Sequence, residues 1–386
     1  MNRKKPENFV GELSGSIGDL GTFLPYIIGA ITIGGLDTTG VLFTFGIMYI
    51  VTGWYYRIPI PVQPMKVMGA AILVHQLTAG EIAAAGLLMG ITLLFLAISG
   101  LVEKLAQLTP QSVTAGIQVG LGISLAILGV KFIQDDLTLG LIIALGMLFL
   151  FSFKKLPVAI IAVVGGTILA FLLHPELSFP RLSAGFYLPN FTFPEWKDFG
   201  RGFTLAYLPQ LPLTLTNAVL VTVALAHNLF PNESSRVNEK NLCISLGLGN
   251  LIAMPLGGFP MCHGSGGLAA HYRFGARTGL SIIMIGVFLL LTAVILGPSG
   301  VDLLGVIPQS VLGALLFFSG IDLIKSGQYS GKGKSLYPFI ITVVLSVAVN
   351  PAVGFVAGIA LVYLLNKGQI GLAGTEEYIT GPELEA

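Results

Sequence analysis

The run Leu108-Thr109-Pro110-Gln111-Ser112-Val113 returns as Val306-Ile307-Pro308-Gln309-Ser310-Val311, an offset of 198 residues. A second match, Pro64-Met65 with Pro260-Met261, has an offset of 196 residues. Both matches lie where apolar segments begin, at corresponding places in two halves of the chain. Short proline-containing matches also arise by chance in apolar sequence, but two matches at nearly one offset favour an internal repeat. The sequence therefore predicts two halves with the same order of segments.

The composition indicates that most of the chain lies in lipid. Of 386 residues, 54% are hydrophobic and 10% are charged, and the mean hydropathy is +0.86. A soluble domain carries about 25% charged residues. The net charge of +1 gives no basic face for nucleic acid. Two cysteines, Cys243 and Cys262, are too few for a disulfide framework or a metal site, and we expect no cofactor.

Apolar runs separated by turn signals predict fourteen transmembrane segments. They cover residues 14–34, 39–56, 64–77, 80–103, 110–131, 137–152, 156–174, 204–229, 241–256, 264–274, 278–297, 309–325, 336–349 and 351–366. Two of them, 64–77 and 264–274, are shorter than the about 20 residues that cross a bilayer, and we interpret them as broken half-helices. Seven segments per half make the second half run inverted through the membrane, which is typical of alternating-access transporters. The predicted fold is an all-α polytopic membrane protein of two inverted seven-segment repeats.

The distribution of Lys and Arg predicts the orientation. With the N-terminus in the cytoplasm, fifteen Lys and Arg residues fall on the inside and four fall outside. We therefore expect a multi-pass protein of the cell membrane whose N-terminus, residues 1–13, and acidic tail, residues 368–386, are both cytoplasmic. The first segment lacks a small-residue cleavage site, so we expect it to be retained as a membrane span. Residues 175–203, rich in Phe and Pro, form one long extracytoplasmic loop, predicted to be an interfacial cover.

The half-helices supply the candidate binding site. A helix N-terminus carries about half a positive charge and several unpaired N–H groups, so two N-termini facing one pocket form an anion site. Lys66, in a first turn, opposes the helix dipole unless an anion lies there. Equally, Lys66 reaches an aqueous vestibule or the rim of the half-helix. Glycines let a backbone approach a ligand, or they serve close helix packing. The candidate substrate-binding residues here are Gln63, Lys66, His263, Gly264, Ser265 and Gly266.

Polar residues in two other segments add to the site. Asp19 is a candidate proton carrier, because an intramembrane carboxylate is costly and faces a pathway or a partner; its alternative role is a structural hydrogen bond. Thr22 lies about one turn away on the same face and is a further substrate-binding candidate. In the eighth segment, Gln210, Thr214 and Asn217 are neutral groups suited to an oxyanion. For Asn217 a helix-packing hydrogen bond is at least as common a role.

Four longer strings resemble one known family. They are Gly15-Ser16-Ile17-Gly18-Asp19-Leu20-Gly21-Thr22-Phe23-Leu24-Pro25, Pro61-Val62-Gln63-Pro64-Met65-Lys66, Asn217-Ala218-Val219-Leu220-Val221-Thr222 and Gly257-Gly258-Phe259-Pro260-Met261-Cys262-His263-Gly264-Ser265-Gly266-Gly267. Together they resemble the molybdate transporter family, a branch of the sulfate permease superfamily, over nearly the whole membrane region. The resemblance implies a uracil-permease-like fold of seven plus seven inverted segments. It also implies molybdate uptake, by proton symport or an unresolved mechanism.

The resemblance further implies a division into two domains. A core domain would comprise segments 1–4 (14–103) and 8–11 (204–297), and a gate domain segments 5–7 (104–174) and 12–14 (298–367). The substrate would lie between segments 1, 3, 8 and 10. Family analogy implies a homodimer surrounded by membrane lipid.

Two departures from the wider superfamily bear on substrate and coupling. Sulfate permeases usually carry a regulatory domain after the last helix, and the about twenty residues after Lys367 are too few for one, which favours molybdate over sulfate. Uracil-permease relatives use acidic residues on segments 8 and 10, which are absent here in those segments. Asp19 or a histidine would then carry a coupling proton, or transport is uncoupled.

Other functions stay open at this point. Sulfate, tungstate or another small anion would fit the same fold, whereas a nucleobase ranks low because the half-helices offer Lys66 and His263 in place of carboxylates. An anion channel is the alternative from a different class and would need a continuous open path. We expect no enzyme, because no nucleophile–base set or metal cluster lies near a membrane face.

Overall fold

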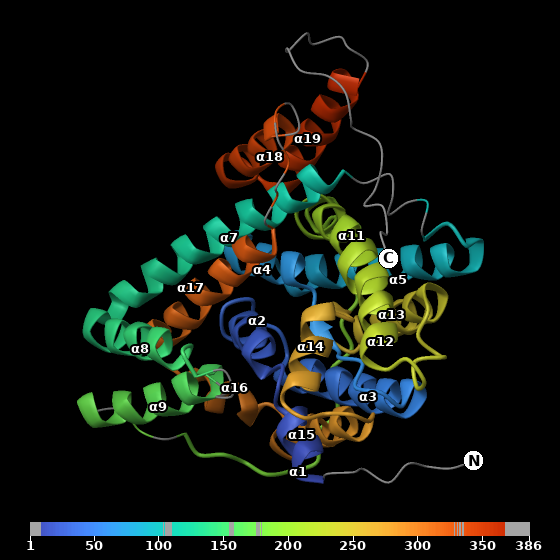
Figure 1. Cartoon of the computed structure of the whole chain (residues 1–386). Helices are drawn as coiled ribbons and strands as arrows, with labels where there is room; N and C mark the ends of the chain where they lie inside the picture. Colours follow the sequence, from blue (N-terminus) through green and yellow to red (C-terminus); the bar gives the residue numbers. More distant parts are fainter. Residues whose placement is uncertain are drawn as a thin grey trace.

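The computed structural model describes residues 9–102, 104, 110–153, 158–174, 178, 180–327, 329, 331, 333 and 336–366. These residues form an almost entirely helical protein (Figure 1). Its helices are α1 Phe9–Ser16, α2 Leu20–Thr32, α3 Thr38–Tyr56, α4 Lys66–His75, α5 Ala79–Ser99, α7 Gln111–Ile133, α8 Leu137–Leu150, α9 Val158–Leu173, α10 Asp198–Arg201, α11 Leu208–Leu213, α12 Thr222–Leu229, α13 Glu239–Ala253, α14 Ser265–Arg273, α15 Leu280–Leu296, α16 Ser299–Gly305, α17 Gln309–Ser326, α18 Leu336–Ala348 and α19 Pro351–Asn366. A 3₁₀ turn, η1 Gln134–Asp136, and two π-helical segments, η2 Gly202–Tyr207 and η3 Thr214–Val221, complete the helical part.

Each predicted segment coincides with a helix, and three details differ. The first segment, predicted as one helix over 14–34, is two helices, because the chain turns at residues 17–19. Gly15, Ser16 and Gly18 weaken the helix there, and the Ser16 hydroxyl donates back to the Leu13 carbonyl at 2.7 Å. Helix α16 was not among the predicted segments. The all-α prediction also omits two short strands, β1 Gln63–Pro64 and β2 Met261–Cys262.

Several predictions lie outside the described residues. They concern the first eight residues of the N-terminus, the tail 368–386, and the side chain of Thr22.

Local sequence signals explain where several helices begin. Asp37 caps α3 by accepting from the Thr39 and Gly40 amides. Thr78 and Glu81 form a reciprocal capping box at the start of α5. Helices α7 and α17 both begin directly after the proline of the repeated run, with Pro110 and Pro308 at their N-caps. The repeat in the sequence therefore marks equivalent helix starts.

Helix pairs with close backbone approach build the packing. Helix α3 packs along α15, α5 along α13, and α7 along α17, while α18 and α19 pack on α7 and on each other (Figure 1). Glycines permit these contacts: a Cβ on Gly46 would lie 2.9 Å from the Gly286 carbonyl oxygen, and one on Gly129 would lie 2.6 Å from that of Gly313. Such approach is typical of membrane helices, which associate through small residues.

Strands β1 and β2 join the starts of the two half-helices near the centre of the molecule. They pair antiparallel, with Gln63 opposite Cys262 and Pro64 opposite Met261. The Met65 amide also donates to the Pro260 carbonyl at 2.9 Å. Since α4 and α14 follow these strands directly, both helices begin beside the same short ladder.

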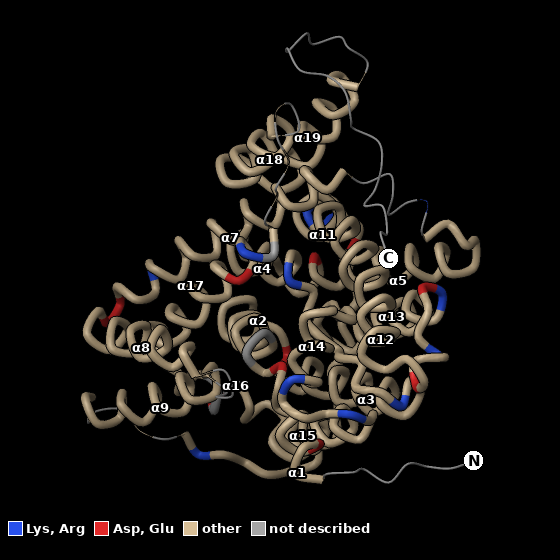
Figure 2. Tube along the Cα trace, viewed as in Figure 1, with Lys and Arg blue, Asp and Glu red and all other residues tan. Residues whose placement is uncertain are grey.

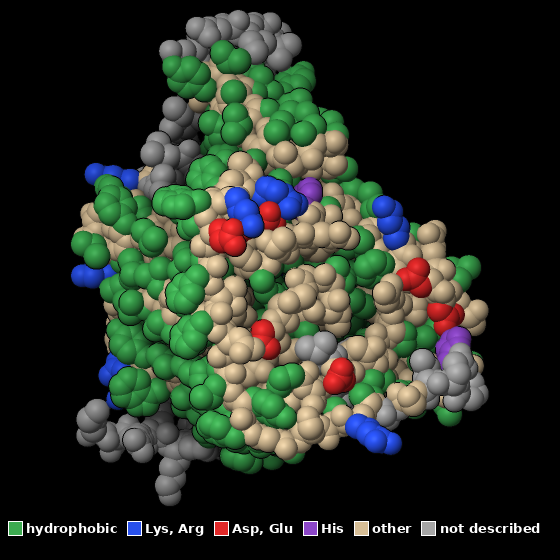
Figure 3. All heavy atoms as spheres, turned by 180° about the vertical axis from the view of Figure 1, so that it is seen from behind, with side chains coloured by type: hydrophobic (Ala, Val, Ile, Leu, Met, Phe, Trp, Pro, Cys, Tyr) green, Lys and Arg blue, Asp and Glu red, His purple; other side chains and the backbone are tan. Residues whose placement is uncertain are grey.

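The outer surface is apolar. Figure 2 shows that charged residues are sparse along the chain, and Figure 3 shows hydrophobic side chains over much of one face. By length and composition, three continuous helical stretches among the described residues can cross a membrane: Ala79–Ser99, Gln111–Leu150 and Asp198–Leu229. Shorter apolar helices of 10–17 residues accompany them. The surface and the helices together fit a protein surrounded by lipid.

Candidate functional site

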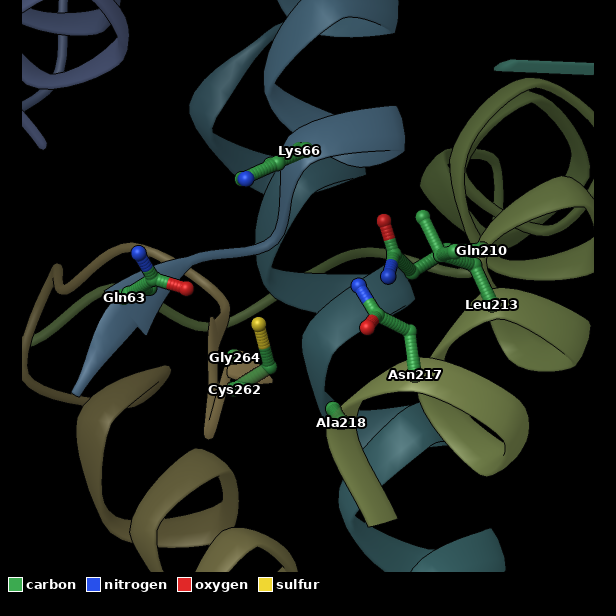
Figure 4. A pocket seen from close by; sticks show the side chains of 8 residues that line it. All are labelled: Gln63, Lys66, Gln210, Leu213, Asn217, Ala218, Cys262 and Gly264. Atoms are coloured by element: carbon green, nitrogen blue, oxygen red, sulfur yellow. The ribbon is translucent and has the colours of Figure 1, made fainter. Parts of the chain in front are cut away.

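A pocket lies where the half-helices meet the helical stretch 198–229. It is a partly open hollow, and the hollow together with the adjoining open space measures about 260 Å³. Figure 4 shows Gln63 and Lys66 on one side and Gln210 and Asn217 on the other. The lining residues are Gln63, Lys66, Gln210, Leu213, Asn217, Ala218, Cys262 and Gly264. Four of the predicted site residues, Gln63, Lys66, Asn217 and Gly264, are thus brought together.

The N-terminus of α4 is already capped by a side chain. The Gln210 Oε1 atom accepts from the amides of Val67 at 2.9 Å and Met68 at 3.1 Å. The Gln210 Nε2 atom donates to the Thr214 hydroxyl at 3.0 Å, which fixes the amide in this orientation. At the other end of α4, Arg201 donates to the His75 carbonyl at 2.9 Å. The stretch 198–229 therefore holds the half-helix at both ends.

The N-terminus of α14 is open in comparison. Its N-cap, Gly264, has no side chain that could accept from the first-turn amides. A Cβ on Gly266 would meet a single neighbour, the Lys66 Nζ atom at 4.0 Å. Gly266 and the Lys66 ammonium thus face the same space, although Gly266 itself is not among the residues that line the pocket. The partial positive charge of the helix end and the full charge of Lys66 both act there, beside the Asp19 carboxylate that lies against Gly267.

Lys66 forms no close ion pair with a described carboxylate, although its charge acts on Asp322. Among the described residues, no carboxylate oxygen lies within 4 Å of its Nζ atom. Its side chain is half-buried. A half-buried ammonium beside an open helix N-terminus creates a positive field that an anion would neutralise.

Asn217 and Ser265 form a polar pair at the pocket wall. The Ser265 hydroxyl donates to the Asn217 Oδ1 atom at 2.6 Å, which leaves the Asn217 Nδ2 group as a donor. Asn217 lies in the π-helical segment η3, where the wider turn changes the direction of side chains. The Thr222 hydroxyl donates to the Asn217 carbonyl at 3.0 Å and to that of His263 at 3.1 Å. This hydroxyl therefore connects η3 to the residue that precedes the N-cap of α14.

A second polar group lies beside the pocket. Asp19 is buried at the N-cap of α2, and its Oδ2 atom accepts from Gln63 Nε2 at 2.6 Å. A Cβ on Gly267 would lie 2.6 Å from this same oxygen, so the carboxylate lies against the first turn of α14. Gln63 also packs against Gly264, where a Cβ would overlap its side chain. The glycines of α14 therefore accommodate Asp19 and Gln63.

His263 is placed differently from the other candidates. It is fully buried, and its two ring nitrogens lie 2.7 Å from the Pro61 carbonyl and 2.7 Å from the Ser245 hydroxyl. Both contacts are to groups outside the pocket lining. His263 therefore holds the segment before α14 in place and does not line the pocket.

The pocket also contains residues that were not candidates from the sequence. They are Leu213, Ala218 and Cys262. Gln210, which the sequence suggested as a group suited to an oxyanion, lines the pocket and caps α4. Gln210 and Asn217 are seven residues apart, a spacing that places them on one helix face and is a usable signal. For Cys262 the signal is its position beside Met261, in the strand that precedes α14.

Comparisons of sequence identify a family, and a comparison of structure identifies a fold. Residues 11–125 and 202–323 match the family described as molybdate transporter of the MFS superfamily. The chain is 33% identical to Molybdate transporter 2 of Arabidopsis thaliana, over 92% of this chain and 87% of that protein. It is 30% identical to Molybdate transporter 1 of the same plant, over 94% and 90%. The transmembrane domain of a cyanobacterium bicarbonate transporter, BicA, superposes with a TM-score of 0.69 at 21% identity, covering 92% of this chain and 99% of that one.

Proposed function

Because the chain belongs to the molybdate transporter family, we propose that it carries molybdate across a membrane and binds the oxyanion in the pocket beside α14. It is a multi-pass membrane protein with the helical transporter fold of the BicA transmembrane domain. It is a transporter and not an enzyme. The observation that carries the proposed binding site is the open N-terminus of α14 opposite the half-buried ammonium of Lys66.

The donors around this space suit a tetrahedral dianion. Lys66 would supply a full positive charge, the first-turn amides of α14 would supply backbone N–H groups, and Asn217 would supply its Nδ2 group. Ser265 would orient Asn217 through the 2.6 Å hydrogen bond. Gln63 would act from the opposite wall, where it also contacts Asp19. Thr22 stays a candidate on the strength of its place in the sequence.

The packing supports the inverted repeat. The repeat offset of 198 residues makes α5 equivalent to α15, and α3 equivalent to α13. The contact between α5 and α13 is therefore equivalent to the contact between α15 and α3, and both contacts are observed. The same offset carries Gly122 onto Gly320. A Cβ on Gly122 would lie 2.7 Å from the Gly320 carbonyl oxygen, and one on Gly320 would lie 2.6 Å from that of Gly122. A pseudo-twofold axis between α7 and α17 accounts for this reciprocity.

The repeat suggests a mechanism of alternating access. Helices of the proposed core, 14–103 and 204–297, pack mainly on one another, and so do those of the proposed gate, 104–174 and 298–367. Movement of one group against the other would expose the pocket to each side in turn. In this proposal the protein is a homodimer in the cell membrane, imports molybdate, and has both termini in the cytoplasm.

Asp19 is the proposed proton carrier. Its carboxylate lies against α14 and would repel a dianion bound at Gly266, whereas a protonated Asp19 would not. If Asp19 carries the coupling proton, Asp19→Asn should flatten the pH dependence of molybdate uptake relative to the wild type while uptake continues. Uptake by both proteins in proteoliposomes across a pH series measures this. The same pH profile in both proteins would exclude Asp19 as the carrier.

Transport by a carrier can be separated from conduction by a channel. Purified protein in proteoliposomes should take up labelled molybdate with saturation, and unlabelled molybdate inside the vesicles should speed that uptake. A channel would show no such stimulation from the opposite side. Uptake of sulfate with no uptake of molybdate would contradict the proposed substrate.

A further inference from the structure

Residues 185–196 form an extended segment, called here the aromatic strap, that follows the edge of the molecule between α9 and α10 (Figure 1). Backbone hydrogen bonds attach it to two helix ends. The Gly185 amide donates to the Ile295 carbonyl and the Tyr187 amide to the Val294 carbonyl, each at 2.9 Å. The Thr192 amide donates to the Pro255 carbonyl at 2.8 Å. The strap therefore crosses the C-terminal ends of α15 and α13.

The side chains of the strap divide into half-buried ones and exposed ones. Tyr187 and Thr192, which bond to the helix ends, are half-buried, whereas their neighbours face outward. Five large apolar side chains on the outward side are 59–91% exposed: Phe186, Leu188, Phe191, Phe193 and Trp196. So much clustered apolar surface requires a covering partner.

The surface beneath the strap identifies this partner. Helix α15 exposes Phe288, Leu291 and Ile295, which lie on one face at helical spacing, and α13 exposes Leu248 and Ile252. In a multi-pass membrane protein these faces contact lipid. The Ile295 carbonyl is itself an attachment point of the strap, so the outward face of the strap continues the lipid-facing surface to the helix ends.

The C-terminal end of the strap carries charge. Glu195 and Lys197 form an exposed ion pair at 2.9 Å, next to Trp196. Aromatic side chains beside exposed charges are typical of the headgroup region, where the ring contacts acyl chains and the charges stay in water.

We propose that the aromatic strap inserts into the lipid interface and anchors the ends of α13 and α15 at headgroup depth. The occupant of its outward face is phospholipid, and the proposal does not depend on molybdate as the substrate. A second copy of this chain on the same face is the competing outcome.

The two tryptophans of the chain, Trp54 and Trp196, make the depth of the strap measurable. Trp54→Phe leaves Trp196 as the single tryptophan, and Trp196→Phe is the matched variant that reports Trp54. Each protein is placed in vesicles of phosphatidylcholine brominated either near the headgroup or near the chain end. Trp196 emission should be blue-shifted relative to water and quenched more by the shallow bromines than by the deep ones.

A double substitution in the strap tests whether its aromatic side chains hold Trp196 in the lipid interface. In the Trp54→Phe background, Phe191→Ser with Phe193→Ser should weaken the quenching of Trp196 and shift its emission toward that in water. The proposal would be overturned if Trp196 emits at the wavelength of tryptophan in water and is quenched by iodide and not by bromolipid. Blue-shifted emission that neither bromolipid quenches would indicate a covering protein copy and would also overturn it.

Discussion

Lys66→Met should lower the affinity for molybdate about 100-fold or more. The ammonium of Lys66 is half-buried, faces Gly266, and has no carboxylate within 4 Å among the described residues. An oxyanion in this space would add a close counter-charge to the more distant one of Asp322. Truncating one partner of a desolvated charge pair costs about 2–5 kcal/mol, or about 30-fold to several-thousand-fold in affinity, and the stated loss lies within this range. Calorimetric titration of the purified variant with molybdate measures it.

Two variants control for charge and for general damage. Lys66→Arg keeps the positive charge and should retain most of the affinity. Lys240→Met removes an exposed cation from the start of α13, away from the pocket lining, and should bind like the wild type. If Lys66→Met binds molybdate with wild-type affinity, Lys66 lies in an aqueous vestibule or at the rim of the half-helix and does not bind the anion.

Gly266→Val should lower molybdate affinity about 10- to 100-fold and leave the thermal stability of the protein nearly unchanged. A Cβ at Gly266 meets only Lys66 Nζ, at 4.0 Å, so the new side chain would start in the proposed anion space with no clash at its Cβ atom. It would block at least one charge-assisted hydrogen bond, worth about 1.5–3 kcal/mol. Binding and the melting temperature are measured on the same preparation.

Neighbouring glycines provide contrasting outcomes. In α9, a Cβ on Gly165 would meet nothing within 4 Å, so Gly165→Val should change neither the molybdate affinity nor the melting temperature. Gly267→Ala would bring a Cβ 2.6 Å from the Asp19 carboxylate and should lower the melting temperature as well as binding. If Gly266→Val binds molybdate normally, the oxyanion does not lie at the α14 N-terminus.

Much of the fold was predictable because local signals and lipid impose it. The run around Pro110 and its repeat around Pro308 mark two helix starts, and both helices begin at the following glutamine. The short segments after Pro64 and Pro260 are the half-helices α4 and α14. The break at residues 17–19 and the π-helical turns were not predicted, because apolar periodicity tolerates both and tertiary contacts decide them.

The candidate site was predictable in part. Lys66 and Gly264 line the pocket, since the half-helices that carry them meet there. His263 shares their sequence neighbourhood, but it bonds to Ser245 and the Pro61 carbonyl, which a single sequence does not reveal. The cap that Gln210 places on α4 depends on a contact 143 residues apart in the chain. Spacing within one segment carries no information about such a contact.

Competitive binding to the purified protein tests the central claim most directly. Calorimetric titration with molybdate, repeated in the presence of tungstate, sulfate or uracil, should show tight molybdate binding that tungstate displaces and sulfate displaces much less. The same titration on Gly266→Val should show weak binding. Sulfate binding as tight as molybdate binding, or binding of uracil alone, would contradict the proposal that this chain carries molybdate in the pocket beside α14.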